Sequence, residues 1–168
     1  LLLGTWCPSN PFSWSVLWTE PIPSLSPLES EFNIQLLASA GEGIQSHGVS
    51  VNKRWQDPFD FRSYRELSLG YRLQERYDEE YALFPQLWSS GWKGLIQPEF
   101  HLQQQTPTGP YQLILSGQIN TLDSFFYTVD AAVTRQFRLG GDWQLRSRLY
   151  FGHAGDDAPV EYLHFRSS

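Results

Sequence analysis

The chain has 168 residues, of which 15% are aromatic and 18% charged, with a formal net charge of −6 and a pI near 5.1. This acidic balance argues against nucleic acid as a partner, because nucleic-acid binding needs clustered positive charge. The lone Cys7 excludes an internal disulfide framework and any cysteine-based zinc site. Many aromatics, few charges and frequent Gln and Ser suit either a membrane β-barrel or a secreted β-sandwich.

The N-terminal part of the chain is predicted to hold one strand between two irregular segments. Residues 1–11 are expected to be irregular, because prolines interrupt the apolar run before it reaches the length of a spanning helix. The following FSWSVLWT alternates apolar and polar residues with the period of a β-strand. Residues 20–30 contain EPIPSLSPLES, whose prolines disfavour a strand and predict a loop.

The same period of two predicts strands through the middle of the chain. It is clearest in SYRELSLGYRLQERY and is also present in EFNIQLLASAG, VSVNKRW, LIQPEFHLQQQ and YQLILSGQIN. The stretch YALFPQLWSSGWKG is interrupted by Pro85 and two glycines, and is predicted to be a short edge strand or a loop.

The C-terminal part is predicted to form a hairpin of two strands within 125–151. Gly140 and Gly141 can take the positive φ angles that a tight turn requires. A final short strand is expected at 160–165. The fold class predicted for 1–168 is therefore a single all-β domain, an antiparallel up-and-down barrel of about 8–10 strands. Most strands are roughly 8–14 residues long, longer than is usual in soluble sheets, which favours a transmembrane barrel or a section of a larger one.

Charged residues follow the polar parity of the predicted strands. In a membrane barrel these side chains would face the lumen and pair with one another, whereas in a sandwich they would form the solvated surface. The lumen-facing candidates are Arg54, Glu66, Arg72, Arg76, Glu99, Asp130, Arg138, Arg146 and Arg148.

Aromatic residues cluster near the ends of the predicted strands. The two aromatic girdles of a membrane barrel lie at these heights, at the boundaries between lipid and water. The candidate interface aromatics are Trp14, Trp18, Trp55, Tyr77, Tyr111, Phe137, Trp143 and Phe151.

With this alternation and hairpins such as RQFRLGGDWQLRSRLYFG, the chain resembles bacterial outer-membrane β-barrel proteins, and in pattern those of the YaiO type and the exopolysaccharide-export porins. The resemblance implies an outer-membrane protein with a structural, assembly or export and pore role. It implies membrane lipid or lipopolysaccharide as a partner, and possible further subunits of an envelope complex. A barrel this small would be largely filled by side chains, which favours a structural or partner role over free diffusion of solutes.

The sequence shows no catalytic signature, no metal-binding motif and no cofactor motif, so we expect neither a catalyst nor a bound cofactor. Two alternatives stay open: a secreted or periplasmic β-sandwich or lipocalin-like module that binds sugar or lipid, and an outer-membrane acyl hydrolase. The hydrolase hypothesis would use His47 near Ser46 and Ser50, or His153 near Asp156 and Asp157. The more economical interpretation treats these residues as ordinary loop and turn residues, including the acidic pair as a solvated loop.

Overall fold

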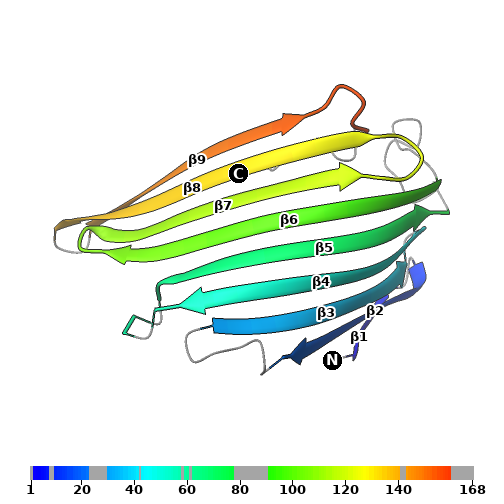
Figure 1. The fold of residues 1–168 in the computed structure, drawn as a ribbon, viewed down its shortest axis with the longest axis horizontal. Helices are drawn as coiled ribbons and strands as arrows, with labels where there is room; N and C mark the ends of the chain where they lie inside the picture. The colour runs from blue at the N-terminus through cyan, green and yellow to red at the C-terminus, as the bar shows by residue number, and fades with distance from the viewer. Residues whose placement is uncertain are drawn as a thin grey trace.

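The computed structural model describes residues 2–7, 10–22, 30–41, 43–57, 59–60, 62–77, 91–140 and 143–159, with side chains from Ser15 onward. Within these ranges the chain is all-β, and nine strands form one sheet in chain order (Figure 1). The strands are β1 Leu2–Cys7, β2 Asn10–Pro21, β3 Ser30–Gly41, β4 Ile44–Gln56, β5 Tyr64–Arg76, β6 Gly91–Thr106, β7 Gly109–Asn120, β8 Phe126–Gly140 and β9 Trp143–Ala154.

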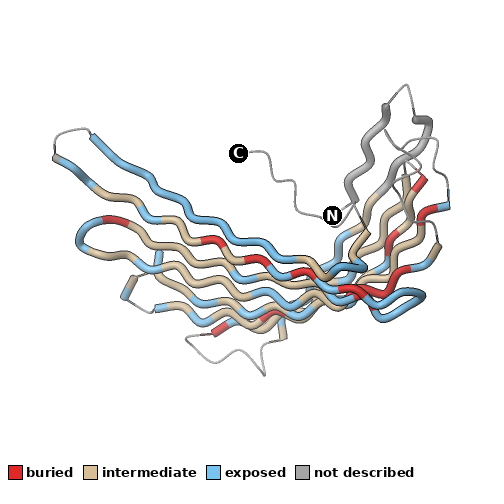
Figure 2. Tube along the Cα trace, turned by 90° about the horizontal axis from the view of Figure 1, so that it is seen from above, coloured by how far each residue is buried: buried red, intermediate tan, exposed pale blue. Residues whose placement is uncertain are grey.

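Each strand pairs antiparallel with the next one along the chain, from β1 to β9. The predicted all-β, antiparallel, up-and-down topology is therefore confirmed for the described residues. The sheet bends into an open trough, and β1 and β9 form its two edges (Figures 1 and 2). Closure into a barrel is not observed in the part of the chain that the structure describes.

The prediction that residues 1–11 are irregular is wrong for most of that segment. Leu2–Cys7 forms β1, and β2 already begins at Asn10. Proline is tolerated here because the register between these strands shifts between Thr5 and Cys7, and Pro11 lies opposite this irregularity. The predicted loop over 20–30 is also shorter at both ends, since β2 extends to Pro21 and β3 begins at Ser30.

Three further expectations concern residues that are described in part or not at all. Residues 23–29, within the predicted proline-rich loop, lie outside the described residues, as does the strand expected at 160–165. The stretch 81–94 was expected to be an edge strand or a loop. Its residues 81–90 lie outside the described residues, and Gly91–Gly94 belongs to β6, which has a neighbour on both sides.

Pro98 lies in the middle of β6, a position that a central strand normally denies to proline. Pro98 pairs with Leu69 on β5. On the β7 side, Ile96 and Glu99 have paired residues, but Gln97 and Pro98 between them do not. The missing N–H of proline explains this gap. Gly117 lies beside it on β7, where an added Cβ would make an ordinary van der Waals contact with Pro98 Cγ at 3.6 Å.

The distribution of burial is opposite to that of a soluble domain. Only three hydrophobic side chains are classed as buried among the described residues, namely Leu95, Phe126 and Ala132, whereas eight polar or charged ones are. Along β5 the exposure alternates, because Leu67, Leu69 and Tyr71 are exposed while the polar residues between them are half-buried. In a curved sheet the inner face is the less accessible one, so the polar face is concave and the apolar face convex.

Candidate functional site on the concave face

The concave face is built by strand register, because residues that pair across an antiparallel sheet point to the same side. One row across β3 to β6 carries charged and titratable side chains: Glu31 opposes Arg54, which opposes Glu66, which opposes His101. Opposite charges directly across a strand pair stabilise the sheet, and Arg54 has such a partner on each side, Glu31 and Glu66. Arg54 also packs over the Tyr64 ring, with its guanidinium carbon 4.0 Å from the ring centroid.

A second row carries mainly hydrogen-bonding groups. It runs through Asn33, Asn52, Ser68, Glu99, Ser116 and Asp130. Ser68 Oγ donates to Asn52 Oδ1, Glu99 hydrogen-bonds the His101 ring, and the Tyr150 hydroxyl donates to Asp130. The Tyr150 bond joins β9 to β8 and so ties the edge strand to the rest of the polar face.

A hollow of about 310 Å³ lies over these rows on β3 to β6. Gly70 contributes no side chain, which leaves space between Ser50 and Gln97 on the neighbouring strands. Every residue lining the hollow belongs to the polar parity: Gln35, Ser50, Asn52, Glu66, Ser68, Gly70, Arg72, Gln97, Glu99 and His101.

Three buried polar atoms on this face have no hydrogen-bond partner among the residues that the structure describes: Asn52 Nδ2, Arg54 Nε and Thr128 Oγ1. Buried donors of this kind normally bind water or a polar solute. The polar groups of the concave face are therefore chemically suited to contact with water. The amides, hydroxyls and paired charges of this face can hydrogen-bond a polar solute, but they do not form an activated nucleophile.

All nine residues predicted to face a lumen share the concave face. The register places Arg54, Glu66, Arg72, Arg76, Glu99, Asp130, Arg138, Arg146 and Arg148 there. Arg76 and Asp130 are buried, whereas Arg138, Arg146 and Arg148 are exposed. The chain carries a negative net charge, yet this face carries seven basic and four acidic residues in β2 to β9, since Lys93 joins the arginines and Glu31 the acids.

The predicted interface aromatics lie near strand ends. Trp18, Trp55, Tyr111, Phe137, Trp143 and Phe151 are each within three residues of the end of a strand, on the apolar parity. Tyr77 follows β5 directly and is 59% exposed, while the side chain of Trp14 lies outside the described residues. Trp92, which was not predicted, shares this position at the start of β6.

Two polar residues of the concave face were also missed, namely Lys93 and Asn120. Asn120 is fully buried at the end of β7. Its Oδ1 accepts a hydrogen bond from Gly94 N at 3.1 Å, and its Nδ2 donates to the carbonyls of Leu122 and Ser124. An Asn before a turn is a known signal for such local bonds, and NTLDS contains it.

The histidines of the hydrolase hypothesis do not form a catalytic arrangement with the residues proposed for them. His47 points to the convex face, whereas Ser46 and Ser50 belong to the concave face, since side chains alternate along β4. The described contact of His153 is with Tyr127, whose hydroxyl lies 3.3 Å from Nε2. Within the described ranges no group of three or more His, Cys, Asp or Glu could hold a metal ion.

The described residues contain no helix long and apolar enough to cross a membrane. Comparison of the chain with protein-family models, with curated proteins and with solved structures finds no match. The fold and the two faces of the sheet are therefore the basis for any functional conclusion.

Proposed function

We propose that this chain forms the wall, or part of the wall, of a transmembrane β-barrel in a bacterial outer membrane, with a structural, assembly or export and pore role. The convex face would contact lipid, and the concave face would line a polar lumen. The barrel would resemble those of the YaiO type or the exopolysaccharide-export porins in pattern.

The inverted burial carries the proposal. A soluble protein buries its large apolar side chains and exposes its charges. Here the convex face exposes Leu69 by 51%, Val129 by 48% and Leu149 by 75%, while Asn52, Lys93 and Asp130 on the concave face are buried. Apolar rows this extensive need an apolar environment, because large exposed apolar patches are rare on soluble monomers.

Strand length supports the same conclusion. Eight of the nine described strands have 12–16 residues, whereas a tilted strand needs about 9–11 residues to cross the hydrocarbon core. The described tryptophan side chains, Trp18, Trp55, Trp92 and Trp143, all lie on the convex face near strand ends. This is where the amphipathic indole ring is favoured at a membrane interface.

The arrangement does not favour the soluble alternatives. A β-sandwich needs two packed sheets, but the described residues form one. A lipocalin-like module that holds a lipid needs an apolar interior, but here the hollow on the concave face is lined by polar-parity residues and most of the exposed large apolar side chains lie on the convex face.

Reconstitution into lipid vesicles tests the proposal. We expect the purified chain to require detergent and to insert into vesicles, and its tryptophan fluorescence to be quenched by lipids brominated near the headgroup. A chain that stays monodisperse in buffer without detergent, with fluorescence unaffected by brominated lipids, would overturn the proposal. Conductance recordings separate the roles: a pore lined by the described concave face should prefer anions, since basic residues outnumber acidic ones there.

A further inference from the structure

We propose that the convex face binds one anionic membrane lipid, whose headgroup phosphate contacts Arg65 and whose acyl chain runs along β5 past Leu67, Leu69 and Tyr71. The binding site is a groove at the ends of β4, β5 and β6. The inference rests on the proposed membrane location and goes further, because it names a lipid class and the residues that recognise it.

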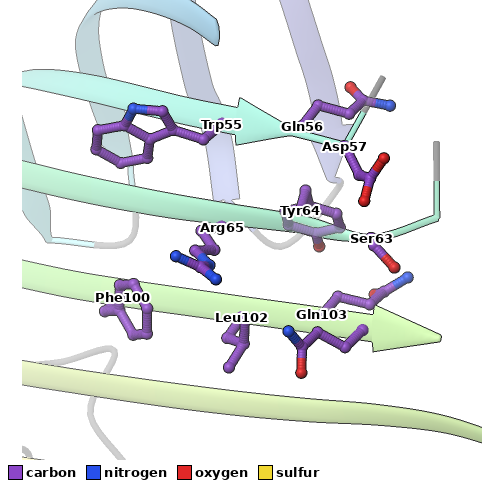
Figure 3. Close-up of a pocket in the computed structure, with 10 residues that line it drawn as sticks. Trp55, Gln56, Asp57, Ser63, Tyr64, Arg65, Phe100, Leu102 and Gln103 are labelled. Atoms are coloured by element: carbon purple, nitrogen blue, oxygen red, sulfur yellow. The ribbon is translucent and has the colours of Figure 1, made fainter. Parts of the chain in front are cut away.

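The groove has a volume of about 480 Å³, and the convex-face residues Trp55, Arg65, Phe100 and Leu102 are among those that line it. Trp55, Arg65 and Leu102 lie in register across three neighbouring strands, so their side chains share one face. Phe100 adds a second apolar wall on β6, and Figure 3 shows these side chains gathered over the strand ends. A phosphate beside Arg65 would thus be flanked by an indole and two apolar side chains.

The positive charge in the groove is available for a ligand. Arg65 is exposed, and its guanidinium has no hydrogen-bond or ion-pair partner within the described residues. Its neighbours in the row are Trp55 and Leu102, so no carboxylate opposes it.

Asp57 is the acidic residue that lines the groove, at its loop end (Figure 3). Its Oδ1 already accepts hydrogen bonds from the backbone N–H groups of Phe59 at 2.8 Å and Asp60 at 3.2 Å. This carboxylate therefore stabilises the loop and forms no ion pair with Arg65 within the described residues, which leaves the guanidinium donors of Arg65 for a phosphate.

An apolar depression on the same three strands favours a lipid over a free phosphate ion. It has a volume of about 340 Å³, and its lining includes Val49, Val51, Leu69, Tyr71 and Ile96. Arg65, Leu67, Leu69 and Tyr71 follow one another on one face of β5, and the first and last of these are about 20 Å apart at 3.4 Å per residue. The headgroup site and the apolar depression therefore lie in line along one strand, as one lipid molecule requires.

The position along the strand also fits a headgroup. A lipid-facing cation is costly at the membrane midplane but not near the interface, where it meets phosphate. Arg65 is the second residue of β5, directly after the loop, whereas Leu69 and Tyr71 are nearer the middle of the strand.

Native mass spectrometry of the protein in a neutral maltoside detergent tests this site. Short-chain phosphatidylglycerol is titrated against phosphatidylcholine of the same chain length. We expect one phosphatidylglycerol to bind with about tenfold preference, because both lipids offer a phosphate but the quaternary ammonium of phosphatidylcholine is repelled by Arg65. An Arg65→Gln variant should lose this preference, while Arg65→Lys should keep part of it because the charge remains.

Arg135→Gln is the matched control, because Arg135 is also a cation on the convex face, over the Phe137 ring, but three strands away from Arg65. It should bind phosphatidylglycerol like the parent protein. Equal losses in both variants would indicate diffuse attraction and would overturn the site. An unchanged preference in Arg65→Gln would do the same, as would displacement of the lipid by an equal concentration of inorganic phosphate. Insertion into vesicles is measured in parallel, so failure of this inference is distinct from failure of the proposed function.

Discussion

The two faces of the sheet differ in chemistry and in accessibility, although the same strands build them. On β5, Leu67 and Leu69 of the convex face are 50% and 51% exposed, whereas Ser68 between them is half-buried and hydrogen-bonded to Asn52. Curvature turns the polar side inward. The exposed apolar side chains of the convex face therefore form no core within the described residues, and the proposed contact with lipid would give them an apolar environment.

Replacing an apolar residue in the middle of the convex face should have the largest effect. Leu69→Lys places a charge at the centre of the face, which costs about 2–4 kcal/mol at the bilayer midplane. Leu139→Lys, at the end of β8, should cost about 0–1 kcal/mol, as expected near an interface. Urea unfolding in lipid vesicles measures both variants. Both leucines are well exposed, at 51% and 65%, so equal small effects would contradict a lipid-facing surface.

On the concave face, Asn120→Ala should lower the free energy of unfolding by about 2 kcal/mol, because it leaves backbone groups of Gly94, Leu122 and Ser124 without their partner. Asn33→Ala is the control, since this half-buried side chain forms no hydrogen bond within the described residues. Similar effects of the two variants in denaturant unfolding would contradict the bridging role of Asn120.

Gly94→Ala tests close packing on the convex face. An added Cβ would come within 2.6 Å of the Tyr71 hydroxyl and 2.9 Å of Leu122 Cγ, so we expect a loss of about 1.5 kcal/mol. Tyr71→Phe removes the closer of these atoms and should relieve part of the loss in the double variant. Additive effects in a double-mutant cycle would show that the two positions are not coupled.

Tyr150→Phe should weaken the attachment of β9 to β8 by about 1 kcal/mol, because the Asp130 carboxylate loses a hydroxyl donor. Tyr111→Phe on the convex face is the control, since its hydroxyl has no hydrogen-bond partner within the described residues. Faster amide hydrogen exchange along β9 in the first variant alone would support the prediction, and equal exchange in both would contradict it.

The smallest effect is expected at the rim, in the loop between β4 and β5. Hydrogen bonds from Ser63 and from the Arg62 backbone hold the pKa of Asp60 below its usual value of 3.8. Because the pKa is lower in the folded loop, the stabilisation is complete above pH 3.8 and is lost as the pH falls through the folded value. Amide chemical shifts of Arg62 should titrate in this range, and Asp60→Asn should abolish that change.

Much of the candidate site was predictable because side-chain alternation depends on local sequence alone. The nine charged residues from Arg54 to Arg148 could be assigned to one face from their parity within single strands. Lys93 was missed because it lies in a stretch interrupted by glycines, where no alternation is visible. The strand Leu2–Cys7 was missed because prolines follow it in the sequence, although Pro11 lies opposite an irregularity in the pairing with β2.

The sequence by itself determined most of the strands and the two chemical faces. Side chains of a β-strand alternate between its two faces, so a sequence that alternates Leu with Arg or Gln places them on opposite faces. The tertiary structure decided which of these residues meet. Register places Arg54 between Glu31 and Glu66, and it brings Trp55 and Leu102 to either side of Arg65. Those contacts join residues of different strands. The direction of curvature, which makes the polar face the concave one, likewise belongs to the sheet as a whole and cannot be read from any single strand.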